Sequence, residues 1–142
     1  MKLLRLLETE VIRLRGFGVS QTGPADHYIN LFKDLSDPPP PGRDGFMIGD
    51  VIVELGKRDQ TTVAINNIQS LSRGEGQSSK ALRELTKTAD ELGITLTLYA
   101  TQYTNRGLTT EQLIGWYERN GFIPDSRYYP GKRGVDMVRV PT

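Results

Sequence analysis

Residues Ile68 to Gly93 read IQSLSRGEGQSSKALRELTKTADELG, which predicts a strand, a loop with two glycines and a helix, in that order. The helix is predicted because apolar residues recur along one face at helical spacing, and because glycine commonly ends a helix. These apolar residues are Ala81, Leu82, Leu85, Ala89 and Leu92. The prediction of the fold starts from this segment.

The loop from Arg73 to Ser79 has the features of an anion-binding loop. The first turn of a helix leaves backbone N–H groups without partners, and glycines such as Gly74 and Gly76 let the chain curl so that those groups converge. Arg73 adds a positive charge, and Ser78 or Ser79 can cap the helix or donate a hydroxyl to phosphate. A tight turn with a serine cap and nothing bound explains the same residues equally well.

Two widespread phosphate loops do not fit the segment. A Walker loop ends in Gly-Lys-Ser/Thr, whereas Lys80 follows two serines with no glycine before it. The dinucleotide fingerprint requires a third glycine where this chain has Ser79. The sequence therefore predicts neither a nucleoside triphosphate nor a dinucleotide as the ligand of the loop.

The loop resembles the acetyl-coenzyme A loop of the GCN5-related N-acetyltransferase (GNAT) family, Gln/Arg-x-x-Gly-x-Gly/Ala between a strand and a helix. Here it reads Arg73-Gly74-Glu75-Gly76-Gln77-Ser78, with serine in the last small position. The resemblance implies that backbone amides from Gly74 through Ser79 hold the pyrophosphate, and that the preceding strand pairs with the pantetheine arm. The implied coenzyme-binding residues are Ile68, Gln69, Ser70, Arg73, Gly74, Glu75, Gly76, Gln77, Ser78, Ser79 and, from a later loop, Asn105.

A second segment, EQLIGWYERNGF from Glu111 to Phe122, resembles a later motif of the same family, a helix ending in Tyr-Glu-x-x-Gly-Phe. The resemblance implies that Tyr117 is a general acid that protonates the coenzyme thiolate as it leaves, which is chemistry that a phenol can perform. Taken alone, Tyr117 is also explained as a core aromatic residue one helical turn after Leu113. The two motifs together favour the catalytic interpretation.

The acceptor amine must lose a proton, and this sequence offers no secure base. Glu54 is the predicted one, with Asn66 and Asn67 as polar neighbours on another strand, although a solvated strand-edge position explains Glu54 as well. His27 either helps to shape the acceptor pocket or lies on the surface. Several aromatic residues either wall a substrate cleft or fill the core: Tyr99, Tyr103, Tyr128, Tyr129 and Trp116.

The remaining elements predict an α/β fold, a mixed sheet with helices on its faces, in one domain. The resemblance implies that this is a GNAT-like, mostly antiparallel sheet in a single N-acetyltransferase-like domain over residues 1–142. Residues 1–15 fit a helix or a strand, and that choice stays open. The prolines Pro38 to Pro41 predict an exposed connector. The other predicted helices are 24–35 and 110–120, and the predicted strands are 46–55 with a break at Gly49-Asp50, 61–69, 94–99, 122–129 and 135–140, with turns at 57–60 and 130–134.

Composition restricts the partners. The 142 residues include 18 basic and 17 acidic ones and no cysteine, which argues against broad nucleic-acid binding and excludes a disulfide framework, a thiolate zinc site and a cysteine nucleophile. The charged start MKLLRLLETEVIRLRG fits neither a signal peptide nor a membrane span, so a cytoplasmic protein is expected. A small group of basic residues could meet the coenzyme 3′-phosphate, an acidic substrate or nucleic acid, or could form a solvated hairpin tip: Arg127, Lys132, Arg133 and Arg139.

The predicted function is transfer of an acetyl group from acetyl-CoA, as co-substrate, to a primary amine by direct attack. The acceptor is expected to be a small molecule or a peptide, with no metal, membrane or nucleic-acid partner, and pairing into a homodimer stays open. The alternative is a non-catalytic module of the same fold that binds or regulates.

Overall fold

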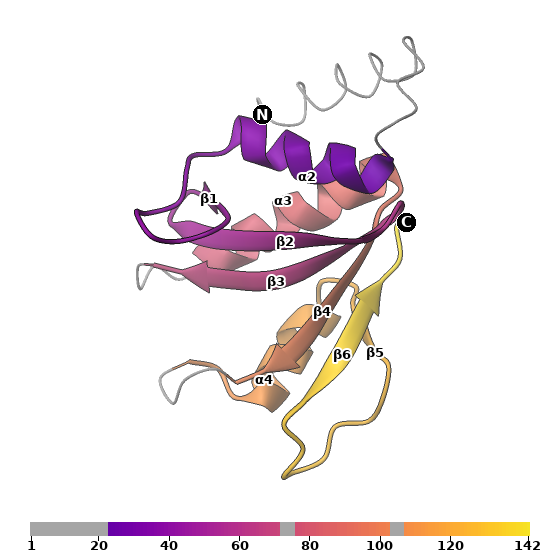
Figure 1. Cartoon of the computed structure of the whole chain (residues 1–142). Coiled ribbons are helices and arrows are strands. Elements are labelled where there is room, and N and C mark those ends of the chain that lie inside the picture. Colours follow the sequence, from indigo (N-terminus) through magenta and orange to yellow (C-terminus); the bar gives the residue numbers. More distant parts are fainter. Residues whose placement is uncertain (1–22, 72–75, 103–106) are drawn as a thin grey trace.

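The computed structural model describes residues 23–71, 76–102 and 107–142, and the elements below belong to these ranges (Figure 1). The predictions for residues 1–15, for Arg73, Gly74 and Glu75, and for Tyr103 and Asn105 lie outside the described residues. The helices are α2 (Pro24–Leu35), α3 (Gln77–Leu92) and α4 (Thr110–Glu118). The strands are β1 (Phe46–Ile48), β2 (Val51–Asp59), β3 (Thr62–Ser70), β4 (Thr95–Thr101), β5 (Ile123–Pro124) and β6 (Gly134–Arg139).

The described strands form one six-stranded sheet in the order β1-β2-β3-β4-β6-β5. Only β3 and β4 pair in parallel, and α3 makes the crossover between them; the other neighbours are antiparallel. The predicted mixed, mostly antiparallel sheet with flanking helices is confirmed. The predicted break at Gly49-Asp50 is also found, between β1 and β2.

The parallel pair β3–β4 is joined at one end only. Residues Thr62–Ala64 pair with Thr95–Thr97, and beyond them the two strands diverge (Figure 1). On its other side β3 stays paired with β2, but the register shifts between Glu54 and Leu55, where Asn66 is the extra residue. Because a bulge bends its strand and increases the local twist, the bulge at Asn66 turns β3 away from β4 at the point where their pairing ends.

The closed end of this pair is supported by a well-packed core. Helix α2 packs against α3, and the fully buried Tyr28 donates its hydroxyl to the Leu85 carbonyl oxygen at 2.8 Å. Burial raises the pKa of Tyr28 well above its ordinary value, so this hydroxyl remains a donor. Phe32 stacks on Phe46 with 5.7 Å between ring centroids, which ties α2 to the edge strand β1.

Arg139 ties the end of β6 to α3 and α4. Its guanidinium donates to both carboxylate oxygens of Asp90, at 2.8 and 2.9 Å, and its Nε donates to the Asn120 carbonyl oxygen at 2.9 Å. The hydrogen bond from Arg139 lowers the pKa of the Asp90 carboxyl. Gly121, with φ +92°, lies so close that an added Cβ would be 3.0 Å from Arg139 Nε. Arg139 is therefore a structural residue, and the alternative that it forms part of a solvated hairpin tip is wrong for this residue.

Three predicted boundaries are corrected. Strand β2 continues through Asp59, so the turn lies at Gln60-Thr61 rather than 57–60, because the Asp59 carboxylate accepts a hydrogen bond from Thr61 N at 2.9 Å. The predicted strand 122–129 shortens to β5, since Lys132 Nζ donates to Ser126 Oγ and the Arg127 carbonyl and holds that segment as a loop. Helix α3 already begins at Gln77 and has no side-chain cap, so neither serine caps it.

Candidate functional site

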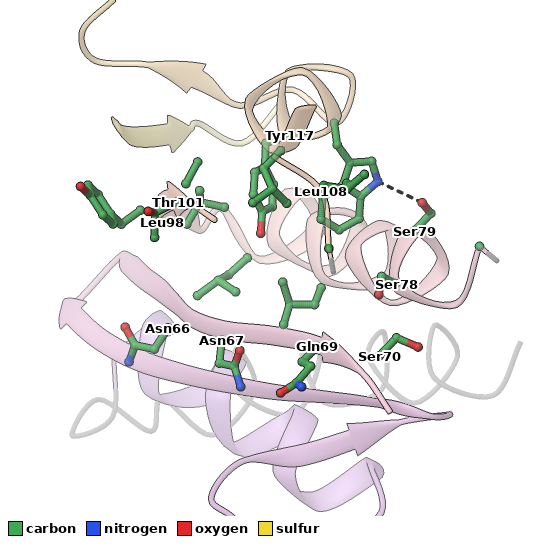
Figure 2. A pocket seen from close by; sticks show the side chains of 18 residues that line it. Asn66, Asn67, Gln69, Ser70, Ser78, Ser79, Leu98, Thr101, Leu108 and Tyr117 are labelled. Atoms are coloured by element: carbon green, nitrogen blue, oxygen red, sulfur yellow. Dashed lines mark hydrogen bonds between the residues drawn. The ribbon is translucent and has the colours of Figure 1, made fainter. Parts of the chain in front are cut away.

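A cleft of about 570 Å³ lies where β3 and β4 diverge (Figure 2). Its walls come from four elements that are far apart in the sequence: β3, the start of α3, the end of β4, and α4. The bulge in β3 opens the space, and the crossover through α3 places the helix N-terminus beside it.

The β3 wall carries the predicted pantetheine-binding residues Ile68, Gln69 and Ser70, all of which line the cleft. Within the described residues, β3 has no strand partner on this side beyond Ala64. Backbone N–H and C=O groups along such an edge can pair with an extended ligand.

The start of α3 brings Gly76, Ser78 and Ser79 to the cleft. Gly76 precedes the helix with φ +84°, a conformation that favours glycine, and its added Cβ would meet nothing within 4 Å. The first turn of α3 therefore presents N–H groups that have no acceptor within the helix, together with the positive end of the helix dipole. Gln77 begins this turn but is not among the residues that line the cleft.

Helix α4 places Tyr117 and Trp116 on the opposite wall. A complete capping box between Thr109 and Gln112 fixes the start of this helix. Tyr117 is 7% exposed, and its ring packs against those of Trp116 and Phe122, at centroid distances of 4.8 and 5.6 Å. Figure 2 shows its hydroxyl directed into the cleft, so Tyr117 belongs both to the core and to the cleft wall.

The candidate base and its neighbours sit at the β2–β3 bulge. Asn67 lines the cleft and donates its amide to Glu54 Oε2 at 3.0 Å, whereas Glu54 itself is not a lining residue. Glu54 is half-buried, and the hydrogen bond from Asn67 holds its carboxylate beside β3. His27 is half-buried on α2 and does not line the cleft.

No acidic or histidine side chain lines the described part of the cleft wall. Across residues 23–71, 76–102 and 107–142, no three His, Asp or Glu side chains are grouped as a metal site. In the same ranges, none of the helices has the length and apolar character needed to cross a bilayer.

A second hollow, of about 420 Å³, meets the cleft at the gap between the strands. Ile65, Asn66, Leu98 and Tyr99 line both spaces. The second hollow is the more polar of the two and is bordered by charged residues: Arg58, Asp125 and Asp136. We refer to it as the far-face groove, because its Thr97, Tyr99 and Asp136 alternate with core residues along β4 and β6. The core residues Leu98 and Met137 also border it.

Two contributions to the site were missed from the sequence. The apolar floor from Leu98 and Ala100 follows from the alternation of β4, which could have been found once its partner strands were known. The hydrogen bond from Trp116 Nε1 to Ser79 Oγ, at 3.0 Å, joins residues 37 positions apart, and no sequence pattern predicts it. None of the four basic residues of the predicted group lines the described part of the cleft. Lys132 donates instead to Ser126 Oγ and to the Arg127 carbonyl oxygen in the loop before β6.

No protein-family model matches the chain, and no curated protein is significantly similar to it. Among solved structures it is similar to the anti-CRISPR protein AcrVA5, at 21% identity and a TM-score of 0.50, over 64% of this chain and 93% of that one. An acyl-CoA N-acyltransferase from Pseudomonas aeruginosa matches at 19% identity and a TM-score of 0.46, over 63% of this chain and 59% of that one. A Bacillus subtilis acetyltransferase in complex with CoA matches at 12% identity and a TM-score of 0.49, over 84% and 86%.

At 21% identity, the likeness to AcrVA5 concerns the fold alone. The first motif lies between β3 and α3, the helix that crosses from β3 to β4. The second motif lies on α4 and just after it, and Tyr117 of this motif faces the cleft where β3 and β4 diverge. The chain therefore has a GNAT-like α/β fold.

Proposed function

We propose that this protein transfers an acetyl group from acetyl-CoA to a primary amine by direct attack. One observation supports this most strongly: the open edge of β3, the uncapped first turn of α3 and the Tyr117 hydroxyl surround a single cleft. These three features suit the pantetheine arm, the pyrophosphate and the leaving sulfur of one extended co-substrate.

Binding would use the backbone more than side chains. The pyrophosphate would accept hydrogen bonds from the N–H groups of Gln77, Ser78 and Ser79, where the helix dipole favours negative charge. The pantetheine amides would pair with β3 along Ile68 to Ser70, leaving the thioester near the bulge. Arg73, Gly74, Glu75 and Asn105 are proposed to complete the phosphate and pantetheine contacts.

The chemistry requires two proton transfers. The amine nitrogen attacks the thioester carbonyl carbon, a C–N bond forms, and the tetrahedral intermediate expels the coenzyme sulfur as the C–S bond breaks. Tyr117 would donate its hydroxyl proton to that sulfur, and Glu54 would take the proton lost by the amine through water beside Asn67. The products are an N-acetylated amine and free CoA thiol, with Tyr117 left as a phenolate and Glu54 as a neutral acid. Atoms and charges balance, and the transfer of one proton from Glu54 to Tyr117 through solvent restores both residues.

The acceptor amine would approach through the far-face groove. This groove and the cleft share Asn66 and Tyr99 as lining residues, beyond the point where β3 and β4 are paired. A small-molecule amine and the amino group of a peptide both suit an approach from this side.

A second candidate function is a non-catalytic binding or regulatory module of the same fold. It is favoured by one observation: Glu54 reaches the cleft only through Asn67, and no acidic or histidine side chain lines the described cleft wall. The anti-CRISPR role belongs to AcrVA5, and the similarity of fold does not carry it to this chain.

Calorimetry with acetyl-CoA tests the proposal, using Gly76→Trp to fill the phosphate end of the cleft. Gly131→Trp is a matched control, because Gly131 also has positive φ, +94°, and open space around it, but lies in the loop before β6. We expect the parent and Gly131→Trp to bind and Gly76→Trp to lose binding. A folded parent protein that gives no binding heat would contradict the proposal.

Turnover then separates the two candidate functions. Release of free CoA thiol in the presence of peptides, polyamines, amino acids or aminoglycosides is expected from the enzyme. Binding of acetyl-CoA with no thiol release across that panel would favour the binding module.

A further inference from the structure

Trp116 is the single tryptophan of the chain, and its indole joins two walls of the cleft. Its Nε1 donates to Ser79 Oγ at 3.0 Å, which links α4 to the first turn of α3 (Figure 2). Its ring also packs against that of Tyr117, with 4.8 Å between centroids. One side chain thus contacts both the turn proposed to hold phosphate and the residue proposed to protonate the leaving sulfur.

The hydrogen bond from Trp116 decides which role the Ser79 hydroxyl takes. An indole N–H can only donate, so the serine oxygen must accept and its own O–H proton remains to be donated. Within the described residues, the Ser79 side chain makes no other hydrogen bond. Because hydrogen bonds in a chain polarise one another, accepting from Trp116 makes the Ser79 hydroxyl a better donor to an anion.

The position of Ser79 matches that use. It is the third residue of α3 and lines the cleft beside Ser78, in the turn whose N–H groups lack acceptors within the helix. An anion at this turn would therefore receive backbone N–H groups and an oriented hydroxyl together.

We propose that Trp116 is a positioning residue that holds the Ser79 hydroxyl as a donor to the pyrophosphate of the coenzyme. This inference rests on the proposed function, because it assigns Ser79 and Trp116 to the same acyl-CoA site. Filling that site also fixes α4 through the indole, so coenzyme binding and the placement of Tyr117 are coupled.

A double-mutant cycle on coenzyme binding tests the inference. Ser79→Ala removes the hydroxyl and is expected to weaken CoA binding about tenfold, the loss of one hydrogen bond to a charged group. Trp116→Phe keeps an aromatic ring but has no N–H, and we expect a loss of roughly threefold to fivefold. The double variant should bind no more weakly than Ser79→Ala alone, because the indole acts only through the hydroxyl.

Three comparisons make the cycle specific. Ser79→Thr restores a hydroxyl, so it should keep the affinity of the parent and its dependence on Trp116. Ser78→Ala leaves the indole contact in place, so Trp116→Phe should keep its full effect in that background. Pantetheine, which has no phosphate, should bind the parent, Ser79→Ala and Trp116→Phe equally, since the proposed donor contacts only the pyrophosphate.

The outcomes separate this inference from the proposed function. If the folded parent does not bind CoA, both are rejected. If the parent binds but the Ser79→Ala and Trp116→Phe losses add fully, or if both variants weaken pantetheine as much as CoA, only the role of Trp116 is overturned. If Trp116→Phe does not fold, the CoA affinities of Ser79→Ala and Ser79→Thr provide the test. Equal affinities would show that the Ser79 hydroxyl does not donate to the pyrophosphate and would overturn the inference.

Discussion

The two ends of the β3–β4 pair are built from the same strands but differ in structure: one end is hydrogen-bonded beside the core, and the other lines a cleft. At the closed end, Thr62–Ala64 and Thr95–Thr97 are paired, and an apolar core that includes α2 and α3 side chains packs nearby. At the open end, Ile65–Ser70 and Leu98–Thr101 line opposite sides of a cleft. The difference shows how one bulged residue, Asn66, divides a pair of strands into a part that stabilises and a part that can bind.

The open end of the pair can stay folded only because the closed end is stable. Backbone groups that lack a neighbouring strand, and a helix start without a side-chain cap, contribute little to folding and are normally satisfied by water or a ligand. The apolar burial at the closed end offsets this loss. Changes at the closed end should therefore alter unfolding, whereas changes at the open end should alter binding and turnover.

The largest expected effect tests the closed end. Tyr28→Ala should lower the free energy of unfolding by about 4 kcal/mol, because it empties a fully buried aromatic site. Tyr28→Phe should lower it by about 1 kcal/mol, since only the hydrogen bond to Leu85 is lost. Urea unfolding measures both. A folded Tyr28→Phe protein that no longer binds CoA would break the proposed division between the two ends.

The next effect tests the open end. Tyr117→Phe should reduce kcat roughly 100-fold, because the leaving sulfur loses its proton donor, while the Kd for CoA stays unchanged. Tyr129→Phe is the control, since that ring is 59% exposed in the loop before β6, outside the described cleft wall. Steady-state rates of thiol release measure the effect. An unchanged kcat in Tyr117→Phe would remove this residue from the mechanism.

A smaller effect is expected at the ion pair between α3 and β6. Asp90→Asn should cost about 2 kcal/mol of unfolding free energy, because the Asp90 and Arg139 side chains are only 25% and 11% exposed and share two hydrogen bonds. Asp26→Asn is the matched control, since its pair with Lys57 is more exposed and should matter far less. Equal losses in the two variants would contradict this account of Asp90.

The smallest effect is the pH dependence of the same pair. The hydrogen bond from Arg139 lowers the pKa of Asp90 in the folded protein below its ordinary value of 3.8. The stabilisation is therefore complete above about pH 5, where Asp90 is ionised in both the folded and the unfolded protein, and is lost as the pH falls through the folded-state pKa. The difference in unfolding free energy between parent and Asp90→Asn should shrink as the pH is lowered below 4. A difference that stays constant down to pH 2 would be inconsistent with a lowered pKa.

Much of the fold was predictable because its signals are local. The apolar spacing from Ala81 to Leu92, with Gly93 at its end, predicted α3, and Pro24 with the apolar residues after it predicted α2. The segment 122–129 misled because its aromatic and β-branched residues resemble a strand. The ladder with β6 covers Ile123 and Pro124, one further backbone hydrogen bond joins Asp125 to Asp136, and the hydrogen bonds of Lys132 hold Ser126 and Arg127 in a loop.

The candidate site was predictable in its parts and not in its arrangement. The sequence by itself predicted a phosphate-type loop before α3 and determined a tyrosine on α4, because glycine backbone freedom and helical spacing are properties of neighbouring residues. Only the tertiary structure decided that β3 and β4 separate after Ala64, that Glu54 reaches the cleft through Asn67, and that Trp116 holds Ser79. Strand register and contacts across the core join residues far apart in the chain, and local sequence patterns carry no information about them.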